Sequence, residues 1–234
     1  GEWLADVSVE KESLLTFSQR ETSHLYSIDL TSKAEAQLTD SLGREFWPAA
    51  SPDGSKLIYQ AIDHDLAVWD PRKADLLVQA LPNRGPATRI AASAYDVTWS
   101  PDGRKLAYLK TVNKQTSLWT LDIEGGKEKQ ITPVGVSFGG QVGGLRNEKA
   151  QVNSLGWSPD GSKLAFAMRE NGVINAYLVN ADGTERNRIS DNTDPKRRIF
   201  CPLWSPRGEK LAFVVDYGRT GGADGQFWEV WTWS

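Results

Sequence analysis

One ten-residue sequence recurs along this chain and sets the period of its fold. Residues 99–108, Trp-Ser-Pro-Asp-Gly-Arg-Lys-Leu-Ala-Tyr, recur with few changes at 157–166 and 204–213 and, less closely, at 50–59. A degraded copy at 7–16 keeps a serine and a leucine but lacks the proline and the glycine. The serines of successive copies are 43 to 58 residues apart. A sustained period of this order indicates a repeat architecture, here with five units.

Each repeat reads as a set of four strands. Proline presets φ at the second turn position and glycine accepts the left-handed residue, so Ser-Pro-Asp-Gly predicts a tight hairpin between two strands. Lys-Leu-Ala-Phe follows as the second strand. A third, apolar strand is predicted at 25–29, 118–122 and 176–180. A more polar outer strand is predicted at 36–39, 88–91, 129–132 and 187–190. Four strands per repeat are typical of a β-propeller blade.

These repeats resemble a known family. The Trp-Ser-Pro-Asp-Gly-x-Lys-Leu-Ala-Phe units, with the Leu-Trp-x-Leu-Asp and Gln-Leu-Thr strands after them, are similar to the TolB-type, WD40-like β-propeller repeat of bacterial proteins, and the similarity covers nearly the whole chain. The resemblance implies an all-β propeller, six blades and a periplasmic or extracytoplasmic location. It does not specify a function, because the same repeat occurs in periplasmic TolB, in propellers of prolyl-oligopeptidase-like enzymes and in extracellular regions of bacterial regulators.

We therefore expect one β-propeller domain over residues 1–234. Its blades are expected at about 1–41, 42–92, 93–133, 134–191 and 192–234. The last repeat ends at 230–234, which aligns with the third strand of the other repeats, so its outer strand is missing. Two readings stay open: part of a larger, six-bladed propeller protein, or a five-bladed ring with an open last blade. Any targeting signal has been removed or lies outside this sequence.

Composition excludes some classes of partner. The formal net charge of −3 and the pI near 5.5 argue against nucleic acid, because binding to phosphates requires clustered lysine and arginine. No apolar run approaches the roughly 20 residues of a membrane-spanning helix, so a soluble protein without direct membrane insertion is expected. The single cysteine, Cys201, allows no internal disulfide.

The sequence offers no complete catalytic or metal-binding set. Gly135, Ser137 and Gly139 satisfy Gly-x-Ser-x-Gly, but no helical period follows, and the two histidines, His24 and His64, lie in other repeats, so a loop is expected instead. The acidic segments 63–65 and 191–194 do not reproduce a calcium-binding loop. We expect no metal, no cofactor and no catalysis.

The long connections point to one binding face. In antiparallel blades the connections alternate between two faces, and the long ones, at roughly 60–74, 134–153, 191–199 and 216–227, all fall on the same face. Arginine and aromatic residues, which supply most interface hot spots, occur in or beside them. The candidate residues of this face are Arg44, Phe46, Trp69, Arg72, Phe138, Arg146, Arg197, Arg198, Tyr217 and Arg219.

The expected function is a binding or scaffold domain for a protein or peptide. Two alternatives remain at this stage. One is an accessory propeller that gates substrate access to a prolyl-oligopeptidase-like hydrolase domain. The other is a propeller that binds a glycan or a small ligand at the mouth of its channel.

Overall fold

The computed structural model describes residues 2–8, 13–18, 24–29, 31–41, 43–62, 73–81, 85–133, 137–138, 155–217 and 228–233. Within these ranges the chain forms twenty β-strands and no α-helix. The prediction of an all-β protein is confirmed. No helix long and apolar enough to cross a membrane occurs in this described part of the chain.

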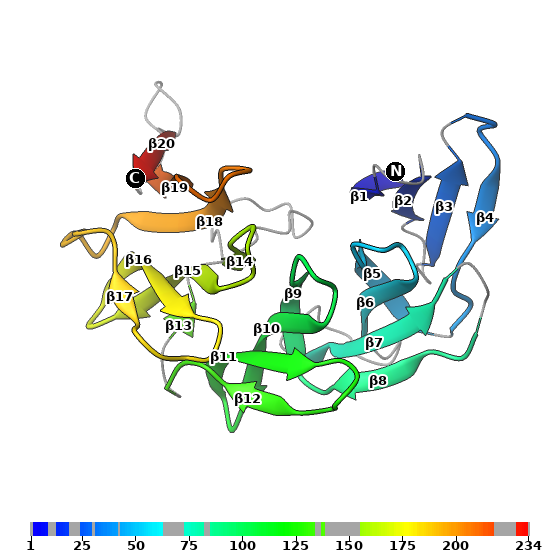
Figure 1. The fold of residues 1–234 in the computed structure, drawn as a ribbon, viewed down its shortest axis with the longest axis horizontal. Helices are drawn as coiled ribbons and strands as arrows, with labels where there is room; N and C mark the ends of the chain where they lie inside the picture. Colours follow the sequence, from blue (N-terminus) through cyan, green and yellow to red (C-terminus); the bar gives the residue numbers. More distant parts are fainter. Residues whose placement is uncertain are drawn as a thin grey trace. The chain divides into compact units, whose positions relative to one another are not determined.

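The strands form five antiparallel sheets (Figure 1). The first sheet has the order β1 (Glu2–Ser8), β2 (Ser13–Ser18), β3 (Leu25–Asp29), β4 (Glu35–Gln37). The second has the order β5 (Arg44–Ala50), β6 (Lys56–Ile62), β7 (Asp75–Ala80), β8 (Thr88–Ala91). The third contains β9 (Ala94–Trp99), β10 (Lys105–Val112), β11 (Gln115–Asp122) and β12 (Glu128–Gln130) in chain order.

The fourth sheet has the order β13 (Ser137–Phe138), β15 (Lys163–Glu170), β16 (Val173–Asn180), β17 (Asn187–Arg188), and β14 (Leu155–Trp157) also pairs with β15. The fifth has three strands, in the order β18 (Arg198–Trp204), β19 (Leu211–Asp216), β20 (Trp228–Trp233). Among the described residues, β20 therefore has a neighbouring strand on one side only. This confirms the prediction that the last repeat lacks its outer strand.

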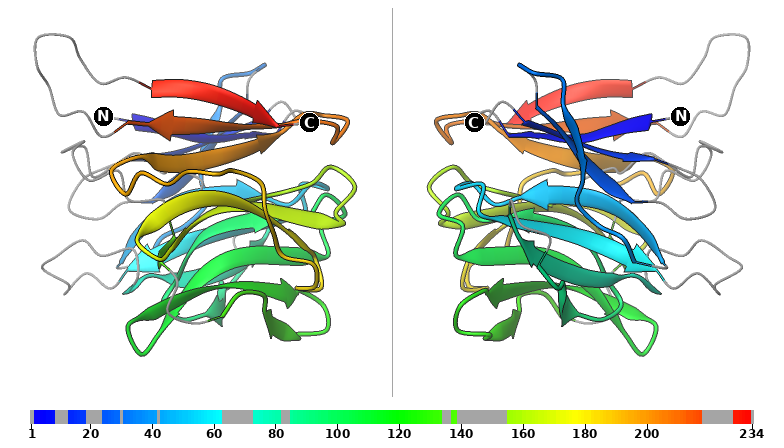
Figure 2. Two further views of the ribbon diagram at one scale, coloured as in Figure 1. Left: turned by 90° about the vertical axis from the view of Figure 1, so that its left-hand side faces the viewer. Right: turned by 90° about the vertical axis from the view of Figure 1, so that its right-hand side faces the viewer.

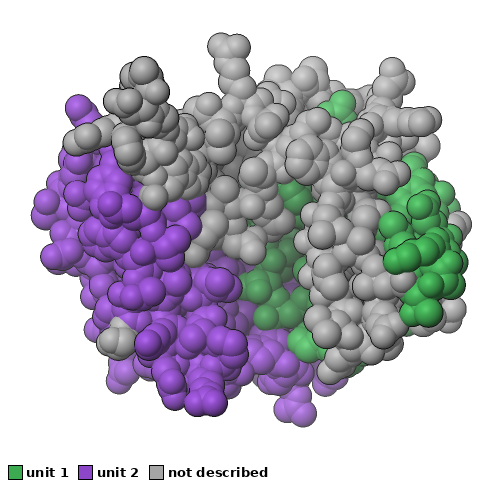
Figure 3. Space-filling view, turned by 90° about the horizontal axis from the view of Figure 1, so that it is seen from above, with its two compact units in different colours: residues 1–99 green, residues 100–234 purple. Residues whose placement is uncertain are grey.

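The chain divides into two compact units, Gly1–Trp99 and Ser100–Ser234 (Figure 3). The division falls after β9, at the first turn of the third repeat. That residues 1–234 form a single domain stays a prediction.

The repeated turn is built as its sequence predicts. In the second sheet, the amide of Gly54 donates to the carbonyl of Ser51 (2.8 Å), and the amide of Lys56 donates to the Ser51 hydroxyl (2.9 Å). The same hydroxyl donates to the carboxylate of Asp53 (2.6 Å). Gly54 has a φ of 65°, a left-handed conformation that side chains with a Cβ rarely adopt. The turn thus fixes the register of the two strands that it joins.

Within each unit, neighbouring sheets pack face to face. In the first unit, Leu25 and Leu38 of the first repeat pack with Leu57 and Tyr59 of the second. In the second unit, the fourth and fifth sheets lie one on the other (Figure 2). Their buried core residues are Ala165, Ala167, Ile174, Ala176, Leu178, Ile199, Leu211, Phe213 and Val215. Small residues of the fourth sheet face larger residues of the fifth, so the two sheets interdigitate.

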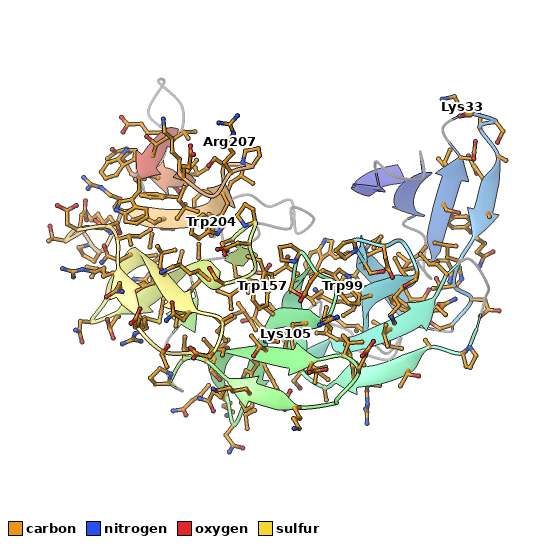
Figure 4. All side chains as sticks on the ribbon, viewed as in Figure 1. Lys33, Trp99, Lys105, Trp157, Trp204 and Arg207 are labelled. Atoms are coloured by element: carbon orange, nitrogen blue, oxygen red, sulfur yellow. The ribbon has the colours of Figure 1, made fainter. Side chains whose placement is uncertain are left out.

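The repeated tryptophans join consecutive sheets (Figure 4). In the first unit the Trp99 Nε1 donates to the carbonyl of Ala49, 3.1 Å away. In the second unit the Trp204 Nε1 donates to the carbonyl of Gly156, 3.2 Å away. Each bond runs from the first strand of one repeat to the first strand of the repeat before it.

Candidate partner-binding surface

Arg197, Tyr217, Glu229 and Trp231 form a cluster in the second unit, here called the arginine–aromatic cluster. Arg197 precedes β18, Tyr217 follows β19, and the other two lie on β20. Antiparallel pairing therefore brings the four residues toward the same end of the fifth sheet. The Arg197 guanidinium lies over the Tyr217 ring, 4.8 Å from its centroid, and 5.8 Å from that of Trp231. The cluster thus combines a cation with two aromatic rings at the surface.

Glu229 holds the two rings in place. Its Oε2 accepts hydrogen bonds from the Tyr217 hydroxyl (2.6 Å) and from the Trp231 Nε1 (2.9 Å). These two bonds, with the nearby charge of Arg197, lower the pKa of the Glu229 carboxyl. The bond to the carboxylate raises the pKa of the Tyr217 hydroxyl. At neutral pH the cluster therefore contains one ionised carboxylate and a neutral tyrosine.

Arg197 is anchored through its backbone and its ring contacts. Its amide donates to the carbonyl of Asp194 (3.1 Å), which places it at the end of the loop before β18. Its Nε is buried and has no hydrogen-bond partner within the described part of the chain. Among the ion pairs of the described residues, none involves Arg197. A half-buried guanidinium held by aromatic faces keeps donor capacity for an incoming group.

Arg198, the neighbouring candidate, is engaged differently. Its guanidinium pairs with the carboxylate of Asp216, which lies opposite it in the β18–β19 register. Asp216 is buried, so this pair is shielded from solvent. The charge of Arg198 is therefore paired within the sheet.

Arg44 and Phe46 lie on β5 in the first unit. Arg44 is half-buried at the start of the strand. Phe46 is only 2% exposed; it packs with Ile62 and Ala74 and makes an edge-to-face contact with Trp47, at 5.0 Å between ring centroids. Phe46 is thus a core residue, and we do not retain it in the partner surface.

The remaining candidates cannot be placed. Trp69, Arg72, Arg146 and Arg219 lie outside the described residues, as does the side chain of Phe138. The structure thus brings together three sequence candidates, Arg197, Arg198 and Tyr217. Glu229 and Trp231 are not among the sequence candidates, because those candidates lie in or beside the long connections, whereas Trp231 lies in the strand predicted at 230–234 and Glu229 directly before it.

A second polar cluster, also missed, occurs in the first unit. The Glu45 carboxylate is 1% exposed, and its Oε2 lies 3.4 Å from the His24 Nδ1. Burial, followed by the charges of Glu45 and Asp40, raises the pKa of the Tyr59 hydroxyl. His24 was considered only as a possible catalytic base. Its position against a buried carboxylate between β3 and β5 indicates a structural contact.

The structure adds little support for the catalytic and metal-binding motifs found in the sequence. Ser137 and Phe138 form β13, which pairs with β15 through Ser137↔Arg169 and Phe138↔Met168. In segment 191–194 the Asn192 Oδ1 accepts from the amide of Asp194 (3.0 Å), as in a turn. Within the described ranges, no three histidine, cysteine, aspartate or glutamate residues are grouped to hold a metal ion. Segment 63–65 lies outside those ranges.

Antiparallel sheets stacked through a repeated turn and tryptophan define a β-propeller repeat protein. Comparison with known proteins agrees: residues 87–227 match the TolB beta propeller domain. The chain belongs to this family.

Two relatives of the chain are named peptidases. The chain is 33% identical to the uncharacterized peptidase YuxL of Bacillus subtilis over 129 residues, which are 54% of this chain and 18% of that protein. It is 31% identical to dipeptidyl-peptidase 5 of Porphyromonas gingivalis over 126 residues, 52% of this chain and 18% of the relative. The chain thus spans about a fifth of these two relatives.

Solved structures share the fold at low identity. A putative TolB from Agrobacterium tumefaciens has a TM-score of 0.67 at 19% identity, over 99% of this chain and 76% of that one. A puromycin-hydrolyzing peptidase of Mycobacterium tuberculosis has a TM-score of 0.68 at 14% identity, over 92% of this chain and 35% of that one. These similarities support the fold and leave the activity open.

Proposed function

We propose that this chain is a non-catalytic propeller domain that binds a protein or peptide partner, with the arginine–aromatic cluster as an anchor of the binding surface. The observation that carries the proposal is the position of Arg197 over the rings of Tyr217 and Trp231. Arginine, tyrosine and tryptophan are the residues most enriched in interface hot spots. The cluster is partly exposed, and Arg197 lies at the end of the loop before β18.

A partner would accept hydrogen bonds from the guanidinium of Arg197. The Nε of Arg197 is buried, so the terminal nitrogens of the guanidinium would be the donors. A carboxylate or a backbone carbonyl of an incoming peptide can accept from the guanidinium while apolar side chains pack on the two rings. Partner segments that carry an acidic or carbonyl-rich turn fit this site best.

The test is a comparison of captured partners. The 234-residue chain is immobilised, bound proteins are identified, and the affinity of each is measured for the wild type, Arg197→Ala and Tyr217→Phe. We expect Arg197→Ala to weaken a specific partner by about tenfold or more, in the range of hot-spot losses. Arg188→Ala, an exposed arginine on β17 away from the cluster, serves as the matched control. Equal affinity of every partner for wild type and Arg197→Ala would contradict the proposal.

A second candidate function follows from the relatives. Two of them are named peptidases, and each is several times longer than the segment it shares with this chain. Under this alternative the chain is the accessory propeller of a peptidase and controls access to a hydrolase domain encoded elsewhere in the same gene. The full-length gene product should then be labelled by a fluorophosphonate probe and cleave peptide p-nitroanilides. Absence of both activities in a folded full-length product would exclude the alternative and favour the binding domain.

A further inference from the structure

The link from β17 to β18, residues 189–197, is folded around one buried asparagine. Asn192 is 3% exposed. Its Nδ2 donates to the carbonyls of Ile174 (2.9 Å), Asp194 (3.2 Å) and Arg197 (3.4 Å), and an amide nitrogen has two hydrogens, so one of them is shared. Its Oδ1 accepts from the amide of Asp194 (3.0 Å). A single side chain therefore bonds a strand of the fourth sheet and both ends of the turn that leads to Arg197.

A second asparagine holds Asn192 against the fourth sheet. Asn175 lies on β16 and is 1% exposed. Its Oδ1 accepts from the amide of Asn192 (2.8 Å), and its Nδ2 donates to the carbonyl of Asn192 (3.1 Å). The Ser190 hydroxyl also donates to this Oδ1 (2.8 Å). Buried amides that are bonded in both directions resist rotation, because each broken bond leaves a polar group without water. Asn192 is thus held in one orientation.

The turn 194–197 extends this order to Arg197. The Arg197 amide donates to the carbonyl of Asp194 (3.1 Å), so the backbone of Arg197 takes its position from the fourth sheet. The rings beside its guanidinium belong to the fifth sheet, since Trp231 lies on β20 and Tyr217 directly follows β19. The guanidinium therefore stays over the two rings only while the turn keeps its place between the two sheets.

The repeat does not require an asparagine at position 175. The amides of Leu118 and Ala176 both donate to a hydroxyl of the segment that follows their strand (2.9 Å each), so Ser117 in the third sheet holds the place of Asn175. The Ser117 hydroxyl accepts from the Nε1 of Trp119 in its own strand (2.8 Å). The third sheet therefore folds with a different residue at this place. In the fourth sheet the asparagine serves the link that leads to the arginine–aromatic cluster.

We propose that Asn192 is a positioning residue for the arginine–aromatic cluster: it holds the turn 194–197 so that the Arg197 guanidinium lies over the two rings before a partner arrives. The inference rests on the proposed function, because it gives Asn192 a role in the same site. A side chain that is already ordered loses less conformational entropy on binding, so this arrangement raises affinity without an added contact. Asn192 is buried and acts through Arg197 alone.

The position of Arg197 can be read from its own side chain by NMR of the isotope-labelled 234-residue chain. Ring currents displace the signals of protons that lie close to aromatic faces, so the Arg197 Hε signal should differ from that of free arginine. In Asn192→Ala it should move to the free-arginine position, while the indole signal of Trp204, which is bonded to Gly156, stays in place. A role in stability alone would not move one signal of a folded chain. Gln79→Leu removes a buried, bonded amide in the first unit and, as the matched control, should leave the Arg197 signal unchanged.

Asn192→Ser tests the same contacts with a smaller disturbance. The serine hydroxyl can still accept from the amide of Asp194, as in a turn, but it is too short to bond the carbonyls of Ile174 and Arg197. The Arg197 signal should therefore move in this variant as well. A free-arginine position of the signal in the wild type, or an unchanged signal in Asn192→Ser, would overturn the proposal.

Partner affinity provides the second measurement. For a partner that Arg197→Ala weakens, Asn192→Ala should raise the Kd about two- to tenfold, which corresponds to ordering one long side chain. The double variant should bind no more weakly than Arg197→Ala alone, because Asn192 acts through Arg197. An unchanged Kd in Asn192→Ala, or additive losses in the double variant, would overturn the proposal. If Arg197→Ala changes the affinity of no partner, the proposed function fails, and the NMR signal still decides whether Asn192 positions Arg197.

Discussion

At the residue scale, one buried position departs from the chemistry of its repeat. Gln60 follows the second-strand motif at the position held by Leu109, Ala167 and Val214 in later repeats. It is fully buried, and neither its amide nitrogen nor its amide oxygen has a hydrogen-bond partner among the described residues. A buried amide that loses water without gaining a partner opposes folding. Gln60 therefore lowers the stability of the folded chain, and the favourable contacts of the rest of the first unit outweigh this loss.

Replacing this glutamine should stabilise the protein. We expect Gln60→Leu to raise the free energy of unfolding by about 1–3 kcal/mol, the usual cost of an unsatisfied buried polar group. Urea unfolding followed by tryptophan fluorescence measures the change. Gln79→Leu is the matched control: Gln79 is also buried, but its Nε2 donates to the carbonyl of Leu38, 3.0 Å away, so this variant should be destabilised. A loss of stability in Gln60→Leu would show that the amide has a favourable role.

At the scale of elements, turns and tryptophans set how one sheet follows another. In the second unit, the glycines of two repeated turns have φ values of 71° and 73°, Gly161 and Gly208. A Cβ on Gly208 would lie 3.4 Å from the Cδ of Pro159 in the preceding turn. The turn motif therefore joins two strands and also packs against the turn of the repeat before it. Trp204 adds a directed hydrogen bond between the same two repeats.

Removal of that hydrogen bond should weaken the stacking of the fourth and fifth sheets. Trp204→Phe keeps an aromatic ring but loses the bond to Gly156, so we expect a loss of about 1–2 kcal/mol in the free energy of unfolding. Trp233→Phe, in the same sheet but 39% exposed, should change it by less than about 0.5 kcal/mol. Thermal and urea unfolding of both variants provide the measurement. Equal effects would mean that the bond contributes nothing beyond ring packing.

At the scale of the whole molecule, three of the repeated turns carry an aspartate at the same position. Hydrogen bonds from the Ser158 hydroxyl and the Ser162 amide lower the pKa of Asp160 to about 2. The equivalent bonds from Ser51 and Ser100 hold the pKa values of Asp53 and Asp102 below their usual range. The fourth strong copy has Arg207 at this place and lacks the carboxylate. Each ionised aspartate favours the folded chain.

This arrangement predicts the direction of the pH dependence. The folded pKa values lie below the unfolded value of about 3.9, so the stabilisation is present above pH 4 and is lost as the pH falls toward 2. Urea midpoints at pH 7, 5, 3.5 and 2.5 should be level at first and then decline. A variant with Asp53→Asn, Asp102→Asn and Asp160→Asn should be less stable at pH 7 and decline less below pH 4. An identical decline in both proteins would assign the effect to other carboxylates.

The candidate site was predictable only in part. Alternation of connections between two faces was enough to place Arg197, Arg198 and Tyr217 on one side of their repeat, because antiparallel strands return to the same edge. The sequence could not show that Arg198 pairs with Asp216 or that Phe46 is buried. These outcomes depend on which side chains of neighbouring strands and sheets meet. The spacing of residues along the chain does not reveal these contacts.

The repeat itself, the four-strand unit, the turn chemistry and the incomplete last repeat were all determined by the sequence, because proline, aspartate and glycine act on their own backbone within a few residues. The tertiary structure decided which groups meet. The Trp204 Nε1 donates to the Gly156 carbonyl, and the Gln60 amide has no hydrogen-bond partner among the described residues. Glu229 and Trp231 lie in one cluster with Arg197. Such contacts join residues far apart in the chain, so their energies depend on how the sheets stack.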